Sequence, residues 1–299
     1  MKQKKFKLTI SRKKSIAGIL FISPWLLGFL GLFLRSIISS IQYSVCDVKI
    51  TTNGLVLAYK GFANYLNAFI VDLHFVQYLT NQISSMLYYV PVILGFSLFM
   101  AVVMNAKFKG RTFVRAVFFL PVIAGSGIIL SIMQGDAMSQ SIISGARSSM
   151  LFKTTELQLI LLQSGLRSDI VSFIMGMVSG IFNLSWKSGL QIILFIAGLQ
   201  TVPQQLYESA HIEGATAWEA FWMITFPMIT PILMVSLIYT IIDGFTDFSN
   251  NVMQYIQSFG QQLNFSYSST LSWIYFIIVF VIIGIVYAVI NKKIVYTVD

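Results

Sequence analysis

The residues best suited to chemistry lie between Tyr207 and Pro231, where the sequence reads YESAHIEGATAWEAFWMITFPMITP. Carboxylates beside a histidine could serve acid–base catalysis or bind a metal ion. However, the HIEG run does not have the H-E-x-x-H spacing of a helical zinc site, and nothing clusters around His211. The sequence also has no G-x-x-x-x-G-K-[ST] phosphate-binding loop. We therefore expect no catalytic, metal or cofactor site in this chain.

The composition indicates an integral membrane protein. Hydrophobic residues make up 56% of the 299 residues and charged residues only 10%, and the mean hydropathy is +0.78. A soluble domain of this length could not bury so much apolar surface. The net charge of +9 would suggest nucleic acid binding in a soluble protein. In a membrane protein it indicates basic residues near the cytoplasmic ends of helices, so we expect lipid and not nucleic acid as a partner.

Six apolar segments approach the ~20 residues that a membrane-spanning helix needs. They cover residues 16–45, 83–106, 116–133, 171–199, 227–242 and 273–290. The first is predicted to be an uncleaved helix, because its apolar run is longer than that of a signal peptide. The expected fold class is all-α: a polytopic membrane domain over 16–291, between a basic N-terminus (1–15) and a short tail (292–299).

Basic residues predict the orientation of these helices. Seven precede the first segment, four lie in the second-to-third connection and two follow the last segment, which is thirteen of the twenty in the chain. Such residues favour the cytoplasmic side, so both termini and the stretch between Tyr207 and Pro231 are predicted to be cytoplasmic. Residues 46–82 and 134–170 are then external. An intramembrane protease would need two partnered groups at membrane depth, where only Asp243 is a candidate acid.

The cytoplasmic stretch is predicted to form two short helices joined at Gly214. Good helix formers precede this glycine, which can end a helix in a left-handed cap. Beyond it, Trp218 and Trp222 are four residues apart and share a helix face. On composition alone, such a module is either an ordinary interfacial connection with an aromatic anchor or a docking surface for a soluble protein.

The order of residues resembles the EAA motif of bacterial ABC importer permeases, which is E-A-A, three residues, G, nine residues, I-x-L-P. Here Glu208-Ser209-Ala210 is followed by three residues and Gly214, and nine more lead to Ile224 and Pro227. Ser209 stands in place of an alanine, Phe226 in place of a leucine, and Glu213 where carbohydrate permeases usually have aspartate. The segments YKGFANYLNAF, NAKFKGRTFVRAVFFLPV and GLQTVPQQLYESA are similar to other parts of MalF-type and UgpA-type sugar permeases.

The resemblance implies a type I ABC importer permease fold in a bacterial cell membrane. The EAA loop, residues 200–227, would be the coupling helix that docks into a cytoplasmic ATPase. ATP and magnesium would be bound by two such ATPase subunits and not by this chain. The remaining partners implied are a second, MalG-like permease, an extracellular solute-binding protein and a carbohydrate substrate.

The candidate substrate pathway lies in the fourth and fifth segments. Ser236, Thr240 and Asp243 follow one another at i, i+4 and i+7 and share one helix face. Polar groups in a membrane helix normally face the bundle interior or a wet cavity. The resemblance to MalF adds Trp186, Lys187 and Leu190 as sugar-lining positions, and Tyr239 could stack on a sugar ring. Hydrogen bonding between helices is the structural alternative.

Lys187 is expected past the membrane midplane, where a lone ammonium is costly. Either it pairs with Asp243 inside the bundle, or it lines a wet cavity and binds an acidic sugar, or it reaches the outer surface. An ion-coupled secondary transporter, which would use Lys187, Asp243 and Arg35, is the alternative function. No obvious internal repeat supports that alternative, and the EAA motif opposes it.

Overall fold

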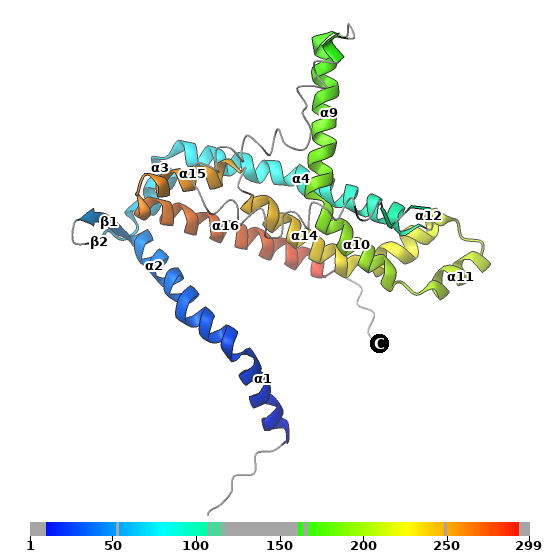
Figure 1. The fold of residues 1–299 in the computed structure, drawn as a ribbon, viewed down its shortest axis with the longest axis horizontal. Helices are drawn as coiled ribbons and strands as arrows, with labels where there is room; N and C mark the ends of the chain where they lie inside the picture. Colours follow the sequence, from blue (N-terminus) through cyan, green and yellow to red (C-terminus); the bar gives the residue numbers. More distant parts are fainter. Residues whose placement is uncertain are drawn as a thin grey trace, which may run out of the picture. The chain divides into compact units, whose positions relative to one another are not determined.

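The computed structural model describes residues 10–51, 54–106, 109–110, 112–113, 116, 161–163, 167–247 and 250–292 (Figure 1). The chain divides into two compact units. The first comprises Met1–Gln82 and Thr246–Val281, and the second comprises Ile83–Phe245 and Ile282–Asp299. Two long helices, α4 (Leu73–Asn105) and α16 (Phe265–Asn291), contribute to both units.

The first unit contains helices and one β-hairpin. Its other elements are α1 (Ile10–Gly28), the π-helical turn η1 (Phe29–Phe33), α2 (Leu34–Val45), β1 (Cys46–Thr51), β2 (Gly54–Tyr59), α3 (Ala63–Ile70) and α15 (Asn251–Gln261). The strands are antiparallel, with Cys46 opposite Tyr59 and Thr51 opposite Gly54. The all-helical prediction was wrong here, because Val48, Ile50 and other β-branched residues favour an extended pair.

A carboxylate joins three helices of the first unit. Asp72 accepts a hydrogen bond from the backbone N–H of Phe75 at 3.0 Å, which caps the first turn of α4. The hydroxyls of Tyr255 in α15 and Tyr267 in α16 donate to the same carboxylate at 3.0 and 2.7 Å. Burial, and then the hydrogen bond to Asp72, raises the pKa of Tyr255 to about 12, so this tyrosine remains a donor at neutral pH.

The second unit contains the helices that carry the candidate site. They are α9 (Ser168–Lys187), α10 (Gly189–Thr201), α11 (Gln204–Ile212), α12 (Ala217–Ala220), the π-helical turn η2 (Phe221–Thr225), α13 (Phe226–Met228) and α14 (Thr230–Thr246).

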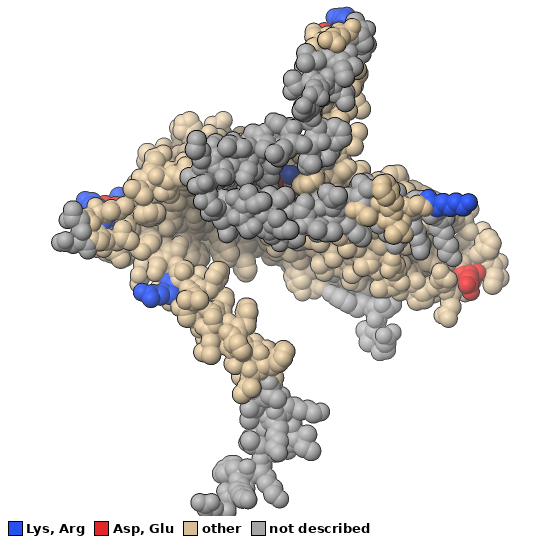
Figure 2. All heavy atoms as spheres, in the orientation of Figure 1, with Lys and Arg blue, Asp and Glu red and all other residues tan. Residues whose placement is uncertain are grey.

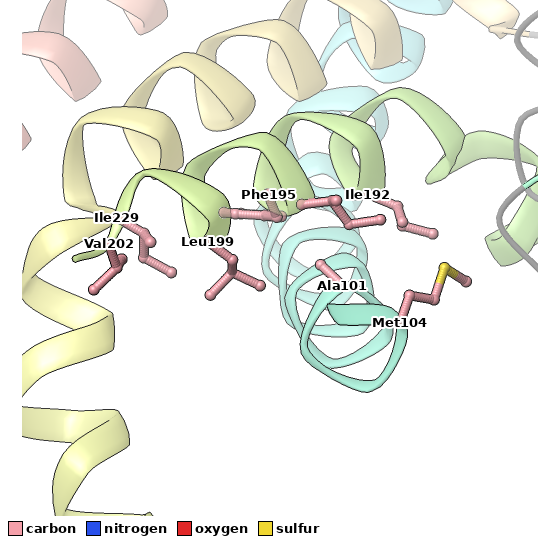
Figure 3. Close-up of a cluster of buried hydrophobic side chains, with 8 residues drawn as sticks. Ala101, Met104, Ile192, Phe195, Leu199, Val202 and Ile229 are labelled. Carbon is pink, nitrogen blue, oxygen red and sulfur yellow. The ribbon is translucent and has the colours of Figure 1, made fainter. Parts of the chain in front are cut away.

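The apolar core of the second unit lies where α4, α10 and the start of α14 meet. Figure 3 shows Ile192, Phe195 and Leu199 of α10 beside Ala101 and Met104 of α4. Val202 and Ile229 complete the buried cluster at the other end. Close contact between such side chains holds α10 against α4 and α14.

The described helices agree in part with the six predicted spans. Four of them, Gly18–Val45, α4, α9 and α16, are long and apolar enough to cross a membrane, and the pair Ala217–Met228 and Thr230–Thr246, bent by 67°, would make a fifth. The predicted third span, 116–133, lies outside the described residues apart from residue 116. Figure 2 shows a mostly uncharged visible surface over the described residues, as expected for contact with lipid.

Two predicted spans differ in their shape. The single helix expected over 171–199 is interrupted at Ser188, which separates α9 from α10. The helix expected over 227–242 begins as the short α13 and turns at Ile229 into α14. Pro227 lies at the start of α13 and Pro231 in the first turn of α14, the positions that proline tolerates in a helix.

Candidate functional site

The module between Tyr207 and Pro231, which is predicted to be cytoplasmic, forms the expected helix–turn–helix. α11 ends at Ile212, and the backbone N–H of Ala215 then donates to Ala210 O at 2.9 Å. Gly214 lies between them at φ +80°, a left-handed conformation that a side chain would strain. The glycine therefore sets the direction in which the chain leaves α11.

A capping box starts the second helix of the module. The Thr216 hydroxyl accepts a hydrogen bond from the Glu219 N–H, and the Glu219 carboxylate accepts one from the Thr216 N–H at 2.8 Å. The Thr216 hydroxyl also donates to this carboxylate at 2.8 Å. The hydrogen bonds that the carboxylate accepts from the Thr216 backbone and hydroxyl lower the pKa of Glu219, because they favour its charged form. Local hydrogen bonds thus cap α12 immediately after the glycine turn.

The predicted coupling residues lie on both sides of the turn at Gly214 and differ in how exposed they are. Glu208, Ser209 and Gly214 are exposed, and Ala210 is half-buried. Ile224 and Pro227, on the far side of the turn, are half-buried, and Ile224 packs against the apolar core.

Hydrophobic side chains also lie on the surface of this module. Ile212 is 86% exposed, and the rings of Trp218 and Trp222 meet edge to face at 5.6 Å. The predicted tryptophan pair is therefore confirmed. Exposed apolar side chains on α11, followed by an aromatic pair, can contact either a soluble protein or the membrane surface.

The predicted polar face of α14 is present in the structure. Ser236 and Thr240 are fully buried, Asp243 is half-buried and Tyr239 is 36% exposed. Figure 1 shows α10 beside α14, and the Thr240 hydroxyl is 3.0 Å from the side-chain amide of Gln191 in α10.

Trp186 and Lys187 are the last two residues of α9, and Leu190 lies in the first turn of α10. The Lys187 ammonium lies 5.4 Å from the centroid of the Tyr89 ring in α4, within the range of a cation–π contact. The structure thus places Lys187 beside Tyr89 of α4, and Leu190 precedes Gln191, which contacts Thr240 on the polar face of α14. Whether Lys187 pairs with Asp243 stays a prediction.

Gln191 is a buried polar residue that the sequence reasoning missed. When its amide oxygen accepts from Thr240, its nitrogen donates to Lys187 O and Ser188 O at 3.1 and 3.2 Å. We prefer this orientation, because the opposite one sets the amide oxygen against two carbonyl oxygens. Gln191 therefore binds the backbone at the α9–α10 interruption and connects it to α14. A single amide in the run GLQIILF was the available signal.

Among the described residues, no group of three or more histidine, cysteine, aspartate and glutamate side chains is placed to hold a metal ion. This part of the chain combines exposed side chains around the Gly214 turn, a bend at Ile229, which we call the elbow, and a polar face on α14. A molecule that contacts the exposed side chains can displace α14, and the polar face of α14 can line a path for a polar solute.

No family model matches the sequence. The chain is 28% identical over 285 residues to the probable ABC transporter permease protein YesP of Bacillus subtilis (strain 168), covering 90% of this chain and 88% of that protein. It is 29% identical to the arabinooligosaccharides transport system permease protein AraP of the same strain, covering 80% of this chain and 72% of AraP. Over most of its length, the chain is therefore similar to ABC transporter sugar permeases.

A solved structure shows that the permease fold extends over the chain. A chain of a bacterial alginate ABC transporter, in complex with an alginate pentasaccharide-bound periplasmic protein, matches with a TM-score of 0.64 at 18% identity. The match covers 92% of this chain and 93% of that chain. The predicted fold type is confirmed by this likeness, and the number of six spans stays a prediction.

Proposed function

We propose that the chain is one permease subunit of an ATP-driven importer for an oligosaccharide. The observation that carries this proposal is the exposed helix–Gly214–helix module, which leads directly into the bent α13–α14 segment. The relative AraP is named for arabinooligosaccharides, and the structural neighbour is an alginate transporter. Six spans with both termini in the cytoplasm belong to the same proposal.

The proposed mechanism assigns ATP binding to other subunits. Two cytoplasmic ATPases bind ATP and magnesium, and one of them docks on α11 through the exposed face that carries Glu208. A MalG-like second permease completes the pathway, and an external solute-binding protein delivers the sugar. ATP binding then shifts the equilibrium between inward-facing and outward-facing states of the helices.

The test of the coupling module is a pair of substitutions at one glycine. Gly214→Val should abolish sugar uptake in the assembled complex while the protein still inserts, because a β-branched residue is strained at φ +80°. Gly214→Asn is the matched control, since asparagine tolerates the left-handed conformation, and it should retain uptake. Normal uptake by the valine variant would overturn the assignment.

The proposed pathway comprises Trp186, Lys187, Leu190, Ser236, Tyr239, Thr240 and Asp243. Its polar members would hydrogen-bond sugar hydroxyls, and its aromatic members would stack on sugar rings. Lys187 gives this pathway a positive charge near the interruption of the helix. We propose that the charge favours sugars that carry carboxylates, and the neighbour named for alginate supports this substrate class.

The substrate-charge proposal is tested with one acidic and one neutral oligosaccharide of equal length. Lys187→Met should reduce uptake of the acidic sugar much more than uptake of the neutral one, with the complex still assembled. If Lys187 instead serves only to pair with Asp243, both sugars lose uptake equally and Asp243→Asn restores it, because neither charge is then left alone. That second pattern would refute the acidic-substrate proposal.

A further inference from the structure

A hydrogen bond joins the two sides of the cytoplasmic module. The hydroxyl of Tyr207, in α11, lies 2.8 Å from Oγ1 of Thr225, the last residue of η2 and 18 positions further along the chain. Thr225 Oγ1 is also 3.4 Å from Ala220 O, to which it can donate. The consistent arrangement is therefore that Tyr207 donates to Thr225 and that Thr225 donates to Ala220 O at the end of α12.

The surroundings of this hydrogen bond differ from those of the rest of α11. No residue of α11 is fully buried, and Glu208, Ser209 and Ile212 are exposed. Tyr207 is half-buried against the apolar core, and Thr225 is only 5% exposed. A hydrogen bond at the edge of a core is shielded from water, so it is better able to hold two elements together than one on the surface.

The covalent connection between α11 and η2, unlike this hydrogen bond, lies on the surface of the protein. It passes through Gly214 and an exposed turn, whose backbone hydrogen bonds go, among the described residues, only to the end of α11. Without the Tyr207–Thr225 bond, α11 could change its angle at Gly214 while η2 stayed in place. With this bond, a displacement of α11 also moves Thr225. Thr225 lies four residues before the elbow at Ile229, and α14 begins directly after that elbow.

We propose that Tyr207 and Thr225 are positioning residues, whose hydrogen bond makes α11, η2 and the elbow move as one piece. This inference rests on the proposed function, in which an ATPase displaces α11. The bond then determines how much of that displacement reaches the helix that carries Ser236, Thr240 and Asp243. Losing it leaves docking and ATP hydrolysis in place and makes each ATP less effective in transport.

The experiment compares transport and ATP hydrolysis in the reconstituted complex with its partner permease, ATPases and binding protein. Tyr207→Phe and Thr225→Val each remove one hydroxyl, and each should lower the sugar transported per ATP roughly threefold or more. The double variant should be no worse than either single variant, because both remove the same bond. Thr225→Ser keeps the hydroxyl and should restore coupling.

Tyr287→Phe, at an exposed tyrosine of α16, is the matched control and should leave the ratio unchanged. An unchanged ratio in both Tyr207→Phe and Thr225→Val would overturn the inference. An equal loss of assembly, ATP hydrolysis and transport would also overturn it, because that pattern would mean that the hydrogen bond only stabilises the folded protein. If Gly214→Val transports normally, the proposed function fails instead, so the two failures are distinguishable.

A second measurement does not depend on transport. Spin labels on Ile212→Cys and Met223→Cys, which are 86% and 77% exposed, report the distance between α11 and η2 in the complex. Cys46 is replaced in this background. The distance distribution should broaden when Tyr207→Phe is added, and an unchanged distribution would contradict the inference.

Discussion

Gln191 shows how much a single buried side chain can determine in this protein. Its amide contacts two backbone carbonyls at the α9–α10 interruption and the hydroxyl of Thr240. Replacing it with leucine should lower the stability of the purified protein by about 1–3 kcal/mol, because buried polar partners lose their hydrogen bonds. Gln200→Leu, at an exposed position of the same helix, is the control. Equal midpoints of thermal unfolding for the two variants would rule out this role.

The packing of α10 against α14 depends on a glycine at the crossing of the two helices. A Cβ atom on Gly198 would lie 2.8 Å from Cγ1 of Ile232, a branched and stiff side chain. Gly198→Ala should therefore destabilise the protein by about 1–3 kcal/mol. In Gly244→Ala the new methyl group would meet the flexible end of Met86, so the loss should be smaller. Thermal unfolding in detergent ranks the variants, and the reverse order would contradict this packing argument.

The orientation of the whole molecule in the membrane is predicted from its charges. It can be tested by labelling with a thiol reagent that does not cross membranes. In a chain without Cys46, a cysteine at residue 140 should react from outside. Cysteines at Lys109 and Gln205 should react only after the membrane is permeabilised. Lys109 lies in a basic connection, which favours the cytoplasm, and Gln205 lies two predicted spans further along the chain, on the same side. Outside labelling at Gln205 would place the coupling module on the wrong side and would reject both the topology and its proposed role.

The sequence by itself determined the membrane class and the helix–turn–helix around Gly214. Both depend on local properties: the apolar composition of segments, the left-handed turn that glycine allows and the capping box between Thr216 and Glu219. The polar face of α14 was predictable for the same reason, because a regular helix fixes which of its residues share a side. The β-hairpin was missed because the segment before α3 was expected only to connect two spans.

Only the tertiary structure decided how distant residues meet. Gln191 and Thr240 are 49 positions apart, and Tyr207 and Thr225 are 18 positions apart. A helix that is apolar on most sides, as α10 is, gives no periodic signal of the side that faces its neighbours. Its partners follow from how α4 and α14 pack around it, as does the place of Gln191 at the interruption of the helix. Helix packing selects these contacts through the shapes of side chains from separate parts of the chain, which spacing along the sequence does not encode.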